Sequence, residues 1–296
     1  MIPMGYTTQH IRVSKTVQLV CAFMCVVTLC LASVTHAANV NDLIFQAADS
    51  HYKGHLDAAI SKFQMALRLE PDNHYAHNQL GLIYAKQERF KESFQEFARV
   101  NTLDGRNTFA LLWLGILYLQ KNDLDNAFDK FHSIVTIDPE NADAYYFIGT
   151  IYNFRHNPRK AIEYLKKARD ADSDEPDTHY RLGRAFHDVG MLTNALMEYQ
   201  KALTLKPTYT KALNEMGWIY YNAGDYTTAI AQWQQVLTIN PKDRDAASNL
   251  AKAYNELGFY ALSQGNKNAA VAYWNATLAV IPHNKAAHYY LEKYGK

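Results

Sequence analysis

The sequence predicts an all-α solenoid, built from helical hairpins that follow one another along the chain. A large apolar residue followed by glycine recurs every 34 residues, at Leu80-Gly81, Leu114-Gly115, Ile148-Gly149, Leu182-Gly183 and Met216-Gly217. A tyrosine or phenylalanine follows each of these glycines by three residues, and a helix-stopping loop recurs at the same interval. A fixed period of this length indicates stacked repeats, which present an extended surface more readily than an enclosed active site.

Residues 1–37 have the pattern of an export segment. Arg12 and Lys15 precede an uncharged, mostly apolar run over 16–34, and small residues surround Ala37. This order is typical of a secretory signal peptide with cleavage after Ala37. The apolar run is also long enough to span a bilayer as an uncleaved anchor. Both alternatives export the repeats, to the periplasm or the extracytoplasmic face of the membrane.

Composition excludes several classes of function for the repeats. The chain of 296 residues is 48% hydrophobic and 20% charged, with a net charge of +1, so it can bury a large core but lacks the basic surplus of a nucleic-acid-binding protein. Its three cysteines, Cys21, Cys25 and Cys30, all precede the repeats. The repeats therefore have no disulfides and no cysteine-ligated metal site.

The repeats are predicted at 40–73, 74–107, 108–141, 142–175, 176–209, 210–243 and 244–284. In each, positions 4, 7, 8 and 11 form the buried face of a first helix, and positions 20, 24 and 27 form that of a second helix. The glycine at position 8 and the alanine at position 20 are expected to let the paired helices approach closely. The aromatic residues at positions 11 and 24 are expected to fill the space between neighbouring hairpins.

The seventh repeat departs from the period. Leu250 and Tyr254 keep the earlier register, whereas Gly265 and Trp274 fit only if seven residues have been inserted. Seven residues make close to two helical turns, so the insertion keeps the same face toward its neighbour and predicts a longer first helix over 244–263. Residues 285–296 are predicted to form a short helix that covers the end of the stack.

The repeats carry, in order and at fixed positions, a large residue, Leu-Gly, Tyr, Ala, Phe or Tyr, Ala and Pro. This pattern resembles the tetratricopeptide repeat over residues 40–284. The first repeat departs from the pattern at Gln46 and Ser50. The resemblance implies a right-handed superhelix with a concave surface lined by first helices. The residues it places there are Tyr75, Asn78, Phe109, Leu112, Tyr146, Asn153, Tyr180, Arg184, Lys211, Asn214, Trp218 and Tyr221.

Aromatic residues and the cations Arg184 and Lys211 on this surface would complement a partner segment that is apolar at one end and acidic at the other. We therefore expect an exported scaffold that binds a protein or peptide partner in a cell-envelope complex. The alternative is an accessory factor of envelope polysaccharide or cell-wall synthesis, in which tyrosines and Trp218 stack on sugar rings. The lysine and asparagine set that the family uses to clamp chaperone tails is not reproduced in three consecutive repeats.

Catalysis has little support, and no catalytic residues, metal site or cofactor are predicted. His51 with His55, and His74 with His77, have helical spacing, but no zinc-binding motif accompanies them, so both pairs are expected to be solvated. The acidic run over 170–177 resembles a calcium loop without its required glycine and final glutamate, and is expected to be a connector.

Overall fold

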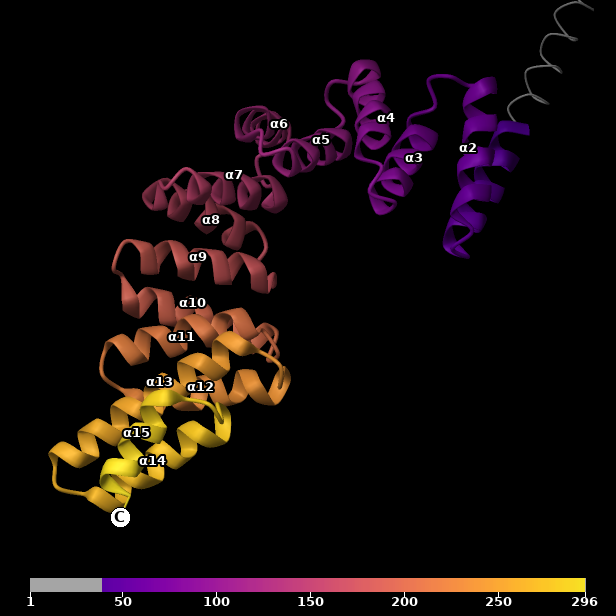
Figure 1. Ribbon diagram of the computed structural model, residues 1–296. Helices are drawn as coiled ribbons and strands as arrows, with labels where there is room; N and C mark the ends of the chain where they lie inside the picture. Colours follow the sequence, from indigo (N-terminus) through magenta and orange to yellow (C-terminus); the bar gives the residue numbers. More distant parts are fainter. Residues whose placement is uncertain (1–38, 296) are drawn as a thin grey trace, which may run out of the picture. The chain divides into compact units, whose positions relative to one another are not determined.

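The computed structural model describes residues 39–295, and these residues are helical with no strand among them (Figure 1). The predicted export segment lies outside the described residues. The described chain divides into two compact units, with the boundary after Lys121. In residues 39–295 no helix is both long enough and apolar enough to cross a membrane.

The described part of the N-terminal unit, residues 39–121, contains five helices. A helix over 39–52 comes first. It is followed by α2 (Leu56–Leu69), α3 (His74–Lys86), α4 (Phe90–Leu103) and α5 (Thr108–Gln120).

The C-terminal unit contains the remaining helices, and consecutive helices pack against one another from α6 to α15 (Figure 1). They are α6 (Leu124–Ile137), α7 (Ala142–Phe154), α8 (Pro158–Ala171), α9 (Pro176–Asp188), α10 (Leu192–Leu205), α11 (Thr210–Asn222), α12 (Tyr226–Ile239), α13 (Arg244–Ser263), α14 (Lys267–Val280) and α15 (Lys285–Tyr294).

Local sequence explains where the helices begin and end. The side chains of Asn73, Asn107 and Asn141 accept a hydrogen bond from the backbone N–H three residues later, which caps α3, α5 and α7. The turn inside each hairpin requires a left-handed residue, and glycine provides it in several repeats, for example Gly190 with φ of +77°. In the second repeat the same turn position is held by Glu88, with φ of +59°.

The glycine at position 8 receives the position-24 side chain of its own hairpin, which is an aromatic ring in the second, fifth and sixth repeats and Leu165 in the fourth. A Cβ built on Gly81 would lie 2.6 Å from Phe97, and one on Gly217 would lie 2.6 Å from Trp233. The same ring also reaches the next hairpin, since Phe97 stacks on Trp113 with centroids 5.7 Å apart. The expectation that position 24 fills only the space between hairpins was therefore incomplete, because the ring occupies both interfaces.

The extended helix in the seventh repeat is confirmed, as α13 runs from Arg244 to Ser263. The shifted register contains a further Leu-Gly pair, Leu257-Gly258, which the sequence analysis missed. A Cβ on Gly258 would lie 2.5 Å from Trp274 Nε1, which reproduces the glycine–ring contact of the earlier hairpins. The capping helix is also confirmed, because Tyr290 of α15 stacks on Trp274 with centroids 5.2 Å apart.

Candidate partner-binding site

Four of the predicted surface residues belong to the N-terminal unit. Tyr75 and Phe109 are exposed, and each ring rests edge-on against a buried phenylalanine, Phe63 and Phe97 respectively. Leu112 is half-buried. Asn78 is half-buried, and its Oδ1 atom is enclosed without a hydrogen-bond partner.

Side chains of the first helices α7 and α9 line a cavity of about 540 Å³ in the C-terminal unit. We call it the α7–α9 cavity. It is lined by Thr150, Asn153, Phe154, His156, Pro158, Arg181, Arg184 and Asp188.

Two α7 residues that line this cavity have an enclosed oxygen atom without a partner. Thr150 is only 4% exposed, and its Oγ1 makes no hydrogen bond. Asn153 Oδ1 is also buried and unpaired. A buried polar atom without a partner costs about 1–3 kcal/mol, so the unpaired state of either oxygen is unfavourable.

Arg184 supplies positive charge on the opposite side of the α7–α9 cavity. Its side chain is 52% exposed, and its Nε atom lies 3.9 Å from Glu215 Oε1. That separation is too long for a hydrogen bond. His187 Nδ1 lies 3.7 Å from the other oxygen of Glu215, so this carboxylate is shared by two weak contacts.

Tyr146 and Arg181 take part in a polar cluster centred on Asp177, at the start of α9. The Tyr146 hydroxyl donates to Asp177 Oδ2 at 2.5 Å and accepts from Arg181 Nε at 2.5 Å. The Tyr209 hydroxyl donates to the other carboxylate oxygen. The Tyr146 hydroxyl is therefore engaged in hydrogen bonds within the protein, and it positions the Arg181 side chain beside the cavity.

The cluster shifts the pKa of its members. Burial alone would raise the pKa of Asp177, but the hydroxyls of Tyr146 and Tyr209 and the charges of Arg181 and Lys211 lower it. Burial, together with the hydrogen bond to Asp177, raises the pKa of Tyr146 to about 12. Asp177 belongs to the acidic run that the sequence predicted to be a connector, so its role was missed. Its spacing of 31 residues from Tyr146 and 32 from Tyr209 is the only sequence signal.

Lys211 and Tyr180 lie next to this cluster. Lys211 is exposed at the start of α11, with its Nζ 6.0 Å from the centroid of the Tyr180 ring. The Tyr180 ring packs against those of Tyr209 and Tyr199, at 5.3 and 6.0 Å. Tyr180 therefore contributes to the core as well as to the surface.

The last three predicted residues, Asn214, Trp218 and Tyr221, lie on α11. Asn214 and Trp218 line a second cavity of about 300 Å³, together with α13 residues, and Asn214 Oδ1 is buried without a partner. The Trp218 ring meets those of Tyr221 and Trp233 edge-on, and Lys252 lies 5.4 Å from its centroid. Trp218 is therefore in contact with three side chains of the protein itself.

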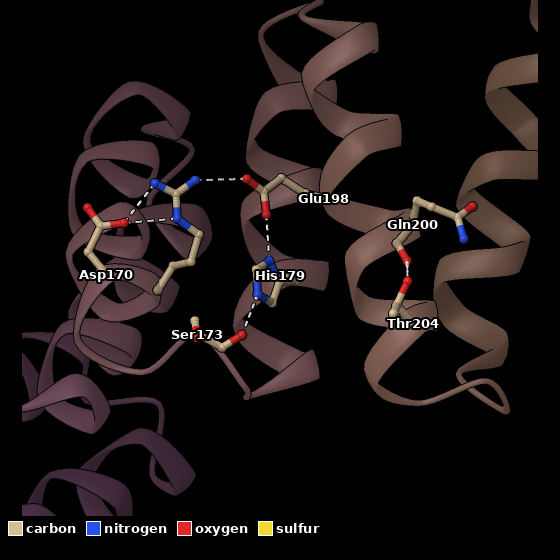
Figure 2. A network of polar contacts seen from close by, with 7 residues as sticks. Asp170, Ser173, His179, Glu198, Gln200 and Thr204 are labelled. Carbon is tan, nitrogen blue, oxygen red and sulfur yellow. Dashed lines mark hydrogen bonds and ion pairs between the residues drawn. The ribbon is translucent and has the colours of Figure 1, made fainter.

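Two histidines at position 4 each contact a glutamate on the second helix of their own hairpin, and the expectation from sequence was wrong for one of them. His77 was expected to be solvated, but it is buried, with Nδ1 2.6 Å from Glu96 and Nε2 2.9 Å from the Pro71 carbonyl oxygen. His179 repeats the arrangement with Glu198 at 2.6 Å and the Ser173 carbonyl at 3.0 Å (Figure 2).

Arg169 extends the second of these networks, since it donates to Glu198 at 2.9 Å and to Asp170 (Figure 2). The network connects α8, the loop before α9, α9 itself and α10. Burial lowers the pKa of His179, but the hydrogen bonds to Glu198 and to the Ser173 carbonyl outweigh it and raise the pKa above 6.5. The network is thus structural and lies apart from the α7–α9 cavity. Within residues 39–295 no three His, Cys, Asp or Glu side chains group as metal ligands.

Comparison with known families agrees with these observations. Models of the tetratricopeptide repeat match residues 50–88, 109–141, 148–210, 198–231 and 217–258, which together cover more than half of the chain. A search of curated proteins found no significant match.

Solved structures share the fold at low sequence identity. The C-terminal part of a repeat protein from Cytophaga hutchinsonii is 19% identical, with a TM-score of 0.68, over 84% of this chain and 99% of that one. The pilF protein of Pseudomonas aeruginosa is 16% identical, with a TM-score of 0.65, over 74% and 99%.

A third structure, YrrB, is described as a repeat protein with an unusual peptide-binding site. It is 20% identical, with a TM-score of 0.52, over 62% of this chain and 95% of its own. The 34-residue period, the paired helices and the family matches together show that the chain belongs to the tetratricopeptide repeat family.

Proposed function

We propose that this protein is an exported scaffold that holds a partner peptide or protein against the first helices of its C-terminal unit, within a cell-envelope complex. Tetratricopeptide repeats bind protein and peptide partners. The envelope role rests on the export pattern of residues 1–37, and the choice of surface rests on the polar atoms described above.

One observation carries the proposal. Thr150, Asn153 and Asn214 bury side-chain oxygens without partners, and all three line cavities between successive first helices. An extended polypeptide has regularly spaced N–H groups that can donate to polar side chains lining such cavities. Exposed Phe154 at the edge of the α7–α9 cavity adds apolar contact area.

Capture from envelope extracts tests the surface. The immobilised repeats should retain a partner that is lost on Arg184→Glu. The matched control is Lys201→Glu, which makes the same charge change at an exposed position of the second helix in the same repeat. If both variants retain the partner as well as the wild type, the chosen surface is wrong.

Fractionation tests the location. The mature protein should be found in the periplasm or on the extracytoplasmic face of the membrane. Sequencing its N-terminus then distinguishes cleavage after Ala37 from an uncleaved anchor. Recovery of the full-length chain in the cytoplasm would contradict export.

A further inference from the structure

We propose that the N-terminal helix, residues 39–52, lies on the surface of a lipid bilayer, with the rings of Phe45 and Tyr52 in the headgroup region. The inference rests on the export segment of the proposed function, and it selects the membrane-anchored form over the cleaved one. It concerns the N-terminal unit, whereas the proposed partner surface belongs to the C-terminal unit. Three observations support it: the exposure of the two rings, the contacts that internal repeats make at equivalent positions, and the apolar run that precedes the helix.

The N-terminal helix exposes two aromatic side chains on one side. Phe45 is 73% exposed and Tyr52 is 93% exposed, the highest values among the large hydrophobic residues of the described chain. The two residues are seven apart, close to two helical turns, so their side chains lie on the same side of the helix. Val40 and Ala47, on the other side, are completely buried. The exposed side therefore faces away from the protein.

Phe45 occupies position 6 of its repeat, where two internal repeats place a ring on the preceding hairpin. Trp113 at this position stacks on Phe97 with centroids 5.7 Å apart, and Phe147 stacks on Phe131 at 4.7 Å. Phe97 and Phe131 belong to the second helix of the preceding repeat. The first repeat has no preceding hairpin among the described residues, so the Phe45 ring lacks this contact.

Position 11 of the first repeat does not favour a further protein helix on this face. Internal repeats have an aromatic residue there that faces the preceding hairpin, as Tyr118 contacts Phe94 at 5.3 Å. The first repeat instead has Ser50, whose hydroxyl donates to the carbonyl oxygen of Gln46 at 2.8 Å. The ring that would pack against a preceding helix is therefore absent, whereas the two exposed rings are present.

Polar side chains flank the two rings. Asp42 accepts from Gln46 Nε2 at 2.9 Å, and Asp49 pairs with Lys53 Nζ at 2.8 Å. A second copy seated on this face would bring the same two acids, so self-association gains no charge complementarity. The headgroup region of a bilayer is polar enough to accept both pairs, and aromatic rings are favoured there. These neighbours therefore suit a helix that lies on the surface rather than one that inserts.

The apolar run over 16–34 would place a bilayer next to this helix. When the run is retained, only residues 35–38 separate it from the start of the helix at residue 39. A chain extends by at most about 3.6 Å per residue, so the helix begins within about 18 Å of the end of the run. Tethering at this distance gives a high effective concentration of lipid, so a contact too weak to hold a free helix can persist.

Quenching by brominated lipid tests the inference on the full-length chain, reconstituted in phosphatidylcholine vesicles. A tryptophan replaces Phe45 or Tyr52, and its fluorescence is compared between vesicles with and without bromine on the acyl chains near the headgroup. The four native tryptophans all lie in the repeats, and the wild type measures their background. The control is Met65→Trp, at a 41% exposed position on the second helix of the same repeat.

We expect Phe45→Trp and Tyr52→Trp to lose fluorescence in the brominated vesicles relative to the wild type, and Met65→Trp to show no such loss. Helical circular dichroism checks the fold of each variant. The chain recovered from its own membranes should retain its first 37 residues, which N-terminal sequencing measures without any substitution.

Several results would overturn the inference but leave the exported scaffold intact. These are no quenching at positions 45 and 52, equal quenching at position 65, and an exported chain that lacks its first 37 residues. If light scattering in detergent shows a dimer and quenching is absent, the exposed face belongs to a second copy instead. A chain found only in the cytoplasm would refute both the inference and the proposed function.

Discussion

Replacing Gly183 by leucine should strongly destabilise the C-terminal unit. A Cβ at this position would lie 2.7 Å from Cε1 of Tyr199 and 3.2 Å from the carbonyl oxygen of Ala195. Tyr199 is completely buried, so its ring has no route to solvent, and the carbonyl oxygen belongs to the backbone of α10. Leucine adds further carbon atoms beyond a Cβ that is itself too close to its neighbours.

The expected magnitude follows from these contacts. Overpacking a buried site costs about 1–3 kcal/mol, and occasionally more. Leucine has a higher helix propensity than glycine, which offsets about 1 kcal/mol of this cost. Because several carbons are added against a fully buried ring and a backbone oxygen, we expect an overpacking cost of about 3 kcal/mol or more, which leaves a net loss of at least about 2 kcal/mol and a fall in melting temperature of at least about 5 °C.

Thermal unfolding followed by circular dichroism measures this loss. Gly183→Ala should give a smaller loss in the same direction. Gly105→Ala is the control, because its Cβ would meet nothing closer than the Asn101 carbonyl oxygen at 3.8 Å, so its melting temperature should be unchanged or slightly higher. A Gly183→Leu melting temperature within about 1 °C of the wild type would refute the packing described here.

Three further predictions concern the histidine networks, the extended helix and the Asp177 cluster. The pKa of His77 and of His179 is raised above 6.5, so their contribution to the free energy of unfolding is complete below pH 6.5 and is lost as the pH rises through the raised values. Urea unfolding between pH 6 and 9 should show that loss, and a double variant with glutamine at both positions should show a flatter profile. Gly258→Ala should destabilise the last hairpin by about 1–3 kcal/mol, visible as faster hydrogen exchange in α14; unchanged exchange there would contradict the shifted register. Asp177→Ala should cost about 1–3 kcal/mol, since it leaves the Tyr146 and Tyr209 hydroxyls without their acceptor, and chemical denaturation with no loss would count against the cluster.

The periodic features of the structure could be predicted from the sequence, because in a repeat protein the same contact recurs at the same interval. The seven-residue slip near Tyr254 was sufficient to place α13 at Arg244–Ser263. The recurrence of glycine and aromatic residues was also visible in the sequence, but the contact that each ring makes was not. Only the structure shows that the ring at position 24 lies on the glycine of its own hairpin.

Polar contacts between elements were harder to predict, because they depend on the directions of particular side chains. His77 and Glu96 are 19 residues apart, and His179 and Glu198 repeat that spacing three repeats later. This recurrence was available in the sequence, yet the neighbouring His74 suggested a solvated pair instead. Asp177 was hidden within a run of acids whose other members are mostly exposed.

The candidate binding residues were chosen by repeat position, and the structure separates them by what they contact. Asn78, Asn153 and Asn214 have unpaired oxygens, whereas Tyr146 and Tyr180 are engaged within the protein. Arg181 joins the α7–α9 cavity although the repeat positions did not predict it to lie on the concave surface. Which of these residues bind a partner stays a prediction.

Site-specific photocrosslinking in living cells tests the central claim most directly. A photoreactive phenylalanine would replace Phe154, which is 61% exposed at the edge of the α7–α9 cavity, or Met197, which is 66% exposed on the second helix α10. If the first helices of the C-terminal unit hold the partner, position 154 should crosslink to one envelope protein and position 197 should not. Crosslinking from position 197 alone, or equally from both, would contradict the account.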